Sequence, residues 1–217
     1  MASAPFREVT ASVELAVRPL ACIAPQAWRN GQSTTRTLAE AADGGWRISL
    51  ADVERDGSYS RFVGMNRVSL VVRGVGVTLN AGSRRIDMRH GCVSAEYDGD
   101  AIWQASLLDG PVLKLNAIVA RERYTARIVV LREPMHLPSG CLALVLTLHG
   151  ASMLRARDLC ETFLLPEAYV YTRPENGGAF DIEAARDKEQ YELNGEAHDE
   201  AQAPYAALVI IEQKARG

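Results

Sequence analysis

Short runs in which apolar and polar residues alternate recur along most of this chain. Trp46, Ile48 and Leu50 alternate with Arg47 and Ser49, and the same pattern occurs in residues 68–72, 75–79, 113–116 and 124–130. Successive side chains point to opposite faces of a strand, so these runs predict strands with one buried face. Residues 34–42 and 182–191 have the spacing expected of helices, although the second is equally typical of a solvated loop.

Turn signals separate these runs at frequent intervals. Asn30-Gly31, Asp56-Gly57 and Asp98-Gly99 are residue pairs that favour tight turns. Residues 141–148 and 206–211 are apolar on both faces, which predicts central strands covered on both sides. The sequence around Gly74 and Gly76 lacks the third glycine of a dinucleotide-binding loop, so we interpret it as a bend where backbones approach closely. Many short strands separated by turns predict an all-β barrel or sandwich.

Charge and cysteine usage exclude several classes of partner and location. The chain has 217 residues and a formal net charge of −3, so it has no overall attraction to nucleic acid or to an anionic membrane. The longest apolar run, residues 141–148, is far shorter than the roughly 20 residues that span a bilayer. The first ten residues lack the apolar core of a signal peptide. We therefore expect a reduced cytoplasmic protein, in which Cys141 is a small core hydrophobe.

Motifs for metal, cofactor or nucleophilic chemistry are absent from the sequence. The four cysteines have no CxxC spacing, and the four histidines, at positions 90, 136, 149 and 198, form no HxH or HExxH pattern. There is no GxSxG elbow and no phosphate-binding GxxxxGK[ST] loop. We therefore expect no metal, no cofactor and no catalytic residue, although ligands converging from distant strands would escape this test.

Polar and aromatic residues gather between positions 28 and 67. Arg47 and Ser49 share one face of the predicted strand, and with Arg67 they are candidates to line a cavity that binds a carboxylate. Asn30 and Thr35 would add amide and hydroxyl contacts at its mouth. The alternative is that Arg47 and Ser49 lie on a solvated sheet face. Asp52 is expected to pair with Arg47 or Arg55.

These residues also carry a family resemblance. The chain resembles the HutD/Ves family, which reads W-[KR]-N-G-G-G-x-T, then W-R-x-S-x-A, then D-G-x-[FY]-S-x-[FY]-x-G-x-x-R, followed by D-G-P and D-x-N. The matching segments are Trp28-Arg-Asn-Gly31 with Thr34-Thr35, Trp46-Arg-Ile-Ser-Leu-Ala-Asp52, Asp56-Gly-Ser-Tyr-Ser60 with Phe62, Gly64 and Arg67, and Asp109-Gly-Pro111 with Asn116. Two positions depart from the pattern: Gln32-Ser33 replace glycines, and Lys114 replaces an aspartate.

The resemblance implies a cupin-like fold, that is, an RmlC-like jelly-roll β-barrel, in a bicupin arrangement within one chain. We expect one bicupin unit of two packed barrels over residues 15–217, preceded by an extension over residues 1–14. The motifs and the predicted cavity together indicate these ligand-binding residues: Asn30, Thr35, Trp46, Arg47, Ser49, Ser60, Arg67 and Asn116.

The resemblance also implies an accessory, non-enzymatic role in histidine utilisation, by binding a small acid such as N-formylglutamate. Two alternatives stay open. One is a Ves-like role in cold or stress responses. The other is a metal-free cupin enzyme acting on a small acid, for which Asp52, Glu96, Tyr97 and His149 are the available acid-base groups. The acidic stretch 174–203 is a candidate docking surface for a basic partner, and exposed strand edges would favour a homodimer.

Overall fold

The chain folds into four antiparallel β-sheets. A computed structural model describes residues 16–27, 33–91, 93–156, 161–185 and 204–215. The six-stranded sheet has the order β2 (Gln26–Ala27), β3 (Ser33–Glu40), β4 (Trp46–Val53), β11 (Val112–Ala120), β6 (Met65–Arg73) and β9 (Ala95–Asp98). The four-stranded sheet facing it has the order β5 (Gly57–Ser58), β10 (Gln104–Leu107), β7 (Gly76–Ala81) and β8 (Arg84–Arg89).

The other two sheets form the second half of the molecule. The five-stranded sheet has the order β1 (Ala16–Pro19), β17 (Tyr169–Arg173), β14 (Leu142–Thr147), β19 (Ala206–Gln213) and β12 (Tyr124–Leu131). The last sheet has the order β13 (Met135–Leu137), β18 (Phe180–Ala184), β15 (Ala151–Ala156) and β16 (Glu161–Pro166). A single turn of 3-10 helix, η1 (Leu20–Cys22), follows β1. No helix in the described part of the chain is long and apolar enough to cross a membrane.

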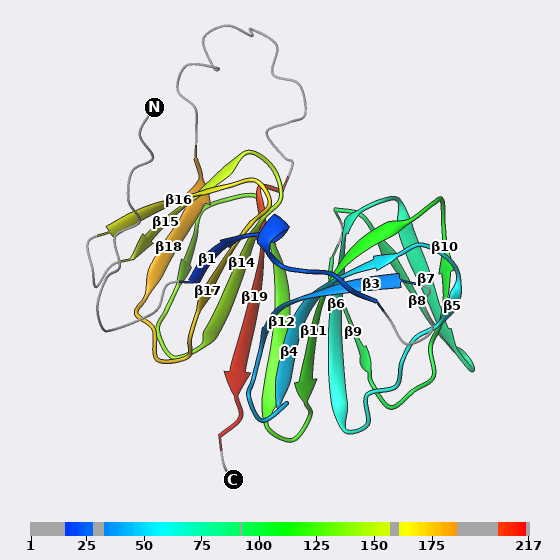
Figure 1. Ribbon diagram of the computed structural model, residues 1–217. Coiled ribbons are helices and arrows are strands. Elements are labelled where there is room, and N and C mark those ends of the chain that lie inside the picture. Colours follow the sequence, from blue (N-terminus) through cyan, green and yellow to red (C-terminus); the bar gives the residue numbers. More distant parts are fainter. Residues whose placement is uncertain (1–15, 28–32, 92, 157–160, 186–203, 216–217) are drawn as a thin grey trace, which may run out of the picture.

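Two barrels lie side by side, which is the bicupin arrangement expected from the resemblance (Figure 1). Strands β2 to β11 form the first barrel, and β12 to β19 form the second. Strand β1 pairs with β17 of the second barrel before the chain enters the first, so the N-terminal strand ties the two halves together. All strand pairings are antiparallel, as the short connections and frequent turns predict.

Three apolar clusters hold these layers together. One lies between the barrels and joins Ile48 and Leu115 of the six-stranded sheet to Leu144 and Val209 of the five-stranded sheet. A second fills the interior of the second barrel, and a third fills part of the interior of the first. Strands β14 and β19 lie centrally in their sheet with both faces buried, which confirms the interpretation of the two fully apolar runs.

The helix expected over residues 34–42 was wrong. Residues Ser33–Glu40 form strand β3, which pairs along β4 with a register shift between Thr37 and Ala39. The shift lets the neighbouring residues Leu38 and Ala39 both pack against the core between the barrels. Two adjacent apolar residues on one side resemble helical spacing, and this produced the error. In the second expected helix, residues up to Ala184 belong to strand β18, and positions 186–191 lie outside the described residues.

The bend at Gly74 is a site of close backbone approach, as expected. Its φ angle is +90°, a left-handed conformation that favours glycine. A Cβ atom there would lie 2.3 Å from the carbonyl oxygen of Pro111. The turn between β6 and β7 therefore requires glycine, and it starts the sheet that closes the first barrel.

Candidate functional site

The inner face of the six-stranded sheet has three successive rows of side chains across its strands. The arginine row contains Arg67 of β6, Ile118 of β11 and Arg47 of β4. The amide row contains Ser69, Asn116, Ser49 and Thr37, and the lysine row contains Val71, Lys114, Ala51 and Thr35. Residues two apart on a strand share a face, so the three rows point into the first barrel. The opposite face, with Ile48, Leu50 and Leu115, is buried against the second barrel.

These rows line a cavity of about 620 Å³ inside the first barrel. Its cationic lining residues are Arg47, Arg61, Arg67 and Lys114, and no described residue lining it is acidic. Beyond the lysine row, Val53 and Val112 belong to the apolar cluster of this barrel, which closes the cavity at that end. The apolar end of the cavity has a low dielectric constant, which strengthens the electrostatic attraction between the basic lining residues and a bound anion.

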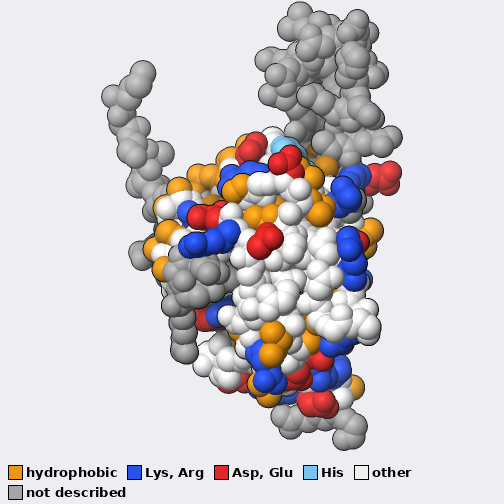
Figure 2. All heavy atoms as spheres, turned by 90° about the vertical axis from the view of Figure 1, so that its right-hand side faces the viewer, with side chains coloured by type: hydrophobic (Ala, Val, Ile, Leu, Met, Phe, Trp, Pro, Cys, Tyr) orange, Lys and Arg blue, Asp and Glu red, His pale blue; other side chains and the backbone are white. Residues whose placement is uncertain are grey.

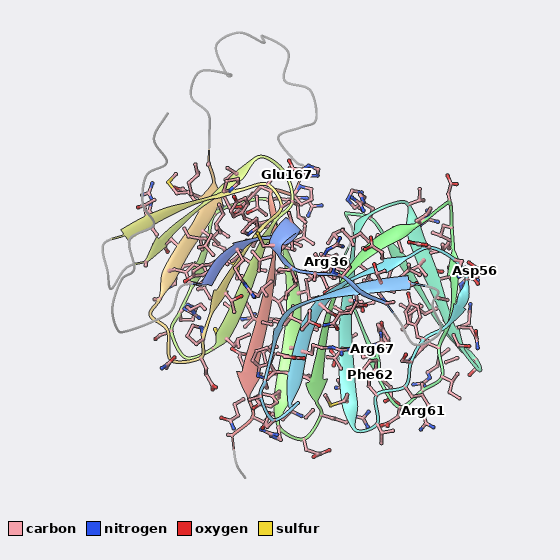
Figure 3. All side chains as sticks on the ribbon, in the orientation of Figure 1. Arg36, Asp56, Arg61, Phe62, Arg67 and Glu167 are labelled. Atoms are coloured by element: carbon pink, nitrogen blue, oxygen red, sulfur yellow. The ribbon has the colours of Figure 1, made fainter. Side chains whose placement is uncertain are left out.

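Arg67 is a buried cation surrounded by aromatic rings. Its side chain is 6% exposed, and its guanidinium carbon lies 5.3, 5.1 and 5.1 Å from the ring centres of Tyr59, Phe62 and Tyr97. The Phe62 ring also lies 5.4 Å from the guanidinium carbon of Arg47, so one ring supports both arginines. Figure 3 labels Arg67 and Phe62 next to each other within the first barrel.

The hydrogen bonds of Arg67 leave part of its guanidinium unsatisfied. Its Nη1 donates to the backbone carbonyl of Ser60 at 3.3 Å. Its Nε is buried and donates to no acceptor among the described residues. A buried cationic donor without an acceptor is energetically costly, and a bound anion would remove that cost.

A directed chain of hydrogen bonds crosses the amide row. Ser69 donates its single hydroxyl proton to Oδ1 of Asn116 at 2.8 Å, so the hydroxyl of Tyr97, 2.9 Å from Ser69, is the donor in that pair. Lys114 Nζ donates to the Tyr97 hydroxyl at 3.3 Å, and Asn116 Nδ2 donates to the backbone carbonyl of Lys114 at 3.2 Å. These bonds fix the positions of the polar groups in the amide row and the lysine row.

Lys114 is the deepest polar group of the cavity. It is 1% exposed, and its Nζ lies 4.0 Å from the ring centre of Tyr59. Burial, and secondarily the nearby Arg67 guanidinium, hold the pKa of the Lys114 amine well below its ordinary value. Burial likewise raises the pKa of the Tyr59 hydroxyl, with a smaller contribution from Tyr97. Both shifts act in the direction of the uncharged form, the free amine for Lys114 and the phenol for Tyr59.

Most of the residues proposed from the sequence meet in this cavity. The structure brings together Thr35, Arg47, Ser49, Ser60, Arg67 and Asn116. Arg47 and Ser49 therefore do not lie on a solvated sheet face, which was the alternative. Whether these residues bind a ligand stays a prediction.

Two of the proposed residues are not part of this group. Trp46 points the other way and lines a separate cavity of about 490 Å³ together with Tyr124, Leu142 and Ile211, so the structure does not bring it to the other six residues, and its role in ligand binding stays a prediction. Its position follows from strand alternation, because Trp46 and Arg47 are neighbours on β4. Asn30 lies outside the described residues.

Asp52 has different partners from those expected. It pairs with Arg36 at 3.2 Å and with Arg73 at 3.7 Å rather than with Arg47 or Arg55. It shares the face of β4 that carries Leu50, away from the cavity, because the two positions differ by two residues.

The acid-base groups considered for an enzyme do not share a site. Asp52 lies on the outer face of β4, and Glu96 contacts Asn66 on the outer face of the sheet. His149 follows β14 in the second barrel, which leaves Tyr97 as the one member of the four that contacts the cavity network. In the described ranges, no three His, Cys, Asp or Glu side chains are grouped closely enough to hold a metal ion.

Sequence reasoning missed several contributors to the cavity, namely Thr37, Arg61, Phe62, Lys114 and Tyr97. Thr37 and Lys114 share the two-residue spacing of Thr35 and Asn116, so strand alternation contained a signal for both. Phe62 comes from a loop, and Tyr97 comes from edge strand β9, whose pairing with β6 is a non-local contact that alternation does not reveal.

The outer surface of the first barrel differs from its interior. Figure 2 looks onto this barrel and shows Lys and Arg side chains intermixed with Asp and Glu around a largely uncharged centre. Some outer cations have carboxylate partners, as in Arg85 with Asp87 at 3.1 Å and Arg121 with Asp100 at 2.9 Å. Three basic side chains of the cavity, Arg47, Arg67 and Lys114, contact aromatic rings in place of carboxylates.

Comparison with known proteins places this architecture in a family. A family model described as HutD matches residues 21–168. The chain is 33% identical over 106 residues to a 21.2 kDa Pseudomonas putida protein described as lying in the hutC 3′ region, and 32% identical over 111 residues to Protein Ves of Citrobacter koseri. These matches cover 46% and 48% of this chain, and about half, 56%, of the length of each relative.

Solved structures support the fold over nearly the whole chain. HutD from Pseudomonas fluorescens SBW25 superposes with a TM-score of 0.72 at 22% identity, covering 92% of this chain and 99% of that one. Oxalate decarboxylase from Lactobacillus farciminis superposes with a TM-score of 0.61 at 8% identity, covering 95% and 87%. At these identities the likeness shows the fold, which is that of the cupins, with two barrels in one chain.

Proposed function

The chain belongs to the HutD family, and we propose that its first barrel binds a small carboxylate such as N-formylglutamate, in an accessory and non-enzymatic role in histidine utilisation. The proposal rests on one observation above all. Arg67 is a buried cation in a cavity without described carboxylates, and its Nε has no acceptor among the described residues.

The chemistry of the cavity supports an anionic ligand. Arginine presents a planar fork of donors that matches the two oxygens of a carboxylate. Arg47 and Arg67 lie in one row and share the Phe62 ring, so both can face one anion. Asn116, Ser49 and Thr35 supply amide and hydroxyl groups further in, where a second polar group of the ligand would bind. About 620 Å³ is ample for an acid of this size.

The link to histidine utilisation rests on the family and on one relative. The Pseudomonas putida relative is described by its position beside hutC. Because the matches span about half of the curated relatives, we transfer this role as a proposal only. The cytoplasmic location is part of the same proposal, since Cys22 and Cys141 are free thiols.

Titration calorimetry of the full chain with N-formylglutamate, glutamate and urocanate tests the proposal. We expect micromolar to millimolar binding of at least one acid, weakened by added salt because the attraction is between charges. Arg67→Gln should weaken that binding about tenfold to a hundredfold, since it removes a buried charged hydrogen bond worth about 1.5–3 kcal/mol.

A matched control separates cavity chemistry from overall charge. Arg89→Gln removes one positive charge from exposed strand β8, outside the cavity, and should leave the affinity unchanged. Absence of heat and of any thermal shift with all three acids would refute carboxylate binding. Equal weakening by both variants would assign the effect to net charge rather than to the cavity.

A further inference from the structure

Lysine is rare in this chain, and one lysine lies inside the cavity. The sequence contains three lysines, at positions 114, 188 and 214, against 21 arginines. Arginine stays protonated in proteins, whereas a buried lysine can release its proton and become a nucleophile. The cavity therefore combines two permanent cations, Arg47 and Arg67, with one group able to react.

The surroundings of Lys114 are those of a reactive amine. Its side chain is buried between the apolar end of the barrel and the amide row, and no described carboxylate contacts it. The neighbouring cation Arg67 opposes protonation further. Desolvation and an adjacent positive charge are the two conditions that activate lysines toward carbonyl compounds.

The donor and acceptor directions of the hydrogen bonds around Lys114 leave the lone pair of its amine available. Nζ donates to the Tyr97 hydroxyl, whose own proton goes to Ser69, because Ser69 donates to Asn116. No described residue donates a hydrogen bond to Nζ. In its neutral form the amine therefore has an unused electron pair beside the cavity.

Lys114 and Arg67 contact the same two aromatic rings. The guanidinium carbon of Arg67 and Nζ of Lys114 lie 5.3 and 4.0 Å from the centre of the same Tyr59 ring. They also flank Tyr97, at 5.1 and 5.9 Å from its ring centre. The lysine row lies four residues further along each strand than the arginine row, with the amide row between them. A carboxylate held by the arginine row would direct the adjoining carbon atoms of a short acid toward the lysine row.

We propose that Lys114 forms a reversible Schiff base with an aldehydic or 2-oxo acid whose carboxylate is held by Arg47 and Arg67. This deepens the proposed function by naming a ligand class, and it rests on that function for the carboxylate contact. The amine lone pair attacks the carbonyl carbon and forms the C–N bond, while the carbonyl π electrons move to oxygen. That oxygen takes both amine protons and leaves as water as the C=N bond forms, so no oxidant or reductant is needed.

Reductive trapping tests the proposal directly. The full-length protein is incubated with glyoxylate and sodium cyanoborohydride, which reduces imines to stable secondary amines, and the modified peptide is identified by mass spectrometry. We expect modification of Lys114 roughly tenfold or more faster than of Lys214, because the bound carboxylate holds the aldehyde beside the amine. Lys214 is exposed and serves as the internal reference.

Two comparisons test the role of the carboxylate. Acetaldehyde has the reactive carbonyl without the acid group, so it should show a much smaller preference for Lys114 than glyoxylate does. Arg67→Gln should remove most of the preference seen with glyoxylate, and Arg89→Gln should not. Modification of Lys114 no faster than of Lys214 would overturn the proposal.

The outcomes also distinguish this inference from the proposed function. Glutarate is a carboxylate without a reactive carbonyl, and it should protect Lys114 from glyoxylate if both occupy the cavity. Calorimetric binding of glutarate without trapping at Lys114 would overturn the Schiff base and leave carboxylate binding intact. Trapping at Lys114 that acetaldehyde reproduces, with no binding of any carboxylate, would overturn the proposed function and the named ligand class together. Lys114→Met should abolish trapping at this position, and its thermal unfolding shows whether the variant is folded.

Discussion

Two buried arginines in this chain are stabilised in different ways. Arg173 is 1% exposed and donates to the backbone carbonyls of Gly178, Pro138 and Cys141. Arg67 is almost as buried, yet its partners are three aromatic rings and the single carbonyl of Ser60. The Nε of each arginine has no acceptor among the described residues, but the Nη atoms of Arg173 donate to three backbone carbonyls, which gives Arg173 a structural role. Arg67 donates to only one carbonyl, so more of its donor capacity is unused, which is typical of residues that serve a ligand at some cost in stability.

This difference predicts opposite effects of the same substitution. Arg173→Met should lower the free energy of unfolding by about 3–5 kcal/mol, because several buried carbonyls lose their donor. Arg67→Met should leave it unchanged or raise it, because it removes a poorly compensated buried charge. Urea denaturation of both variants measures this. A comparable loss of stability in both would show that Arg67 is a structural residue.

Lys114 should make the stability of the protein depend on pH. Its amine has a lowered pKa in the folded protein, so unfolding takes up a proton at pH values between the folded pKa and the ordinary lysine pKa. Stability therefore rises with pH between the folded pKa and the ordinary lysine value of about 10.4. Lys114→Met removes this proton uptake and should raise the free energy of unfolding at pH 7 by about 1–3 kcal/mol.

The advantage of Lys114→Met should shrink as the pH approaches about 10, where the unfolded lysine also loses its proton. Denaturation at neutral and alkaline pH measures the change, with Lys214→Met as the exposed control. A gain that is constant with pH would show that Lys114 is not deprotonated on folding.

At the scale of elements, strand alternation gives the six-stranded sheet two different buried faces. In β11, Leu115 and Ala117 face the second barrel, while Lys114, Asn116 and Ile118 face the cavity. The sequence of such a strand resembles that of a half-exposed strand, because polar residues that face a cavity alternate with apolar residues just as polar residues that face bulk water do. The closure of the barrel depends in turn on the tight turn at Gly74.

Gly74→Ala should destabilise the protein by about 2–4 kcal/mol, because the new methyl group meets a backbone carbonyl and the left-handed conformation disfavours alanine. Gly82→Ala is the matched control, since Gly82 also has a positive φ of +59° but has open space around the added carbon. Thermal unfolding of both variants separates the steric contribution from the conformational one. Equal losses would mean that contact with Pro111 contributes nothing.

At the scale of the whole molecule, the two barrels have different interiors. The second is filled by side chains such as Leu154, Leu165, Tyr171 and Phe180, and the first retains the cavity. The apolar cluster between the barrels contains residues of both halves, and β1 bridges them in sequence. We therefore propose that residues 16–215 unfold as one cooperative unit, in keeping with the single unit expected from the sequence.

Leu144→Ala tests this cooperativity, because Leu144 is fully buried in the cluster between the barrels. We expect a loss of about 2–5 kcal/mol and one calorimetric transition that moves to lower temperature as a whole. Leu164→Ala, at a residue that is 61% exposed, should change little. Two separate transitions, of which only one moves, would show that the barrels unfold independently.

Much of the fold could be predicted from the sequence because alternation, turn residues and apolar runs are local properties. They located strands such as β4, β11, β14 and β19, and the recurring motifs indicated the two-barrel architecture. Alternation also placed Arg47 and Ser49 on one face. It failed at β3, where a register shift places two adjacent apolar residues toward the same core.

Local alternation was enough to locate most of the strands and the residues that share a face in them. That one such face encloses a cavity, while the other is buried between the barrels, became evident only in the folded molecule. Alternation is the same for a face that meets solvent and a face that lines a hollow barrel, so it cannot distinguish them. Lys114, Tyr97 and Arg67 come from three strands that are neighbours in one sheet, and pairing between strands far apart in the sequence is a long-range property.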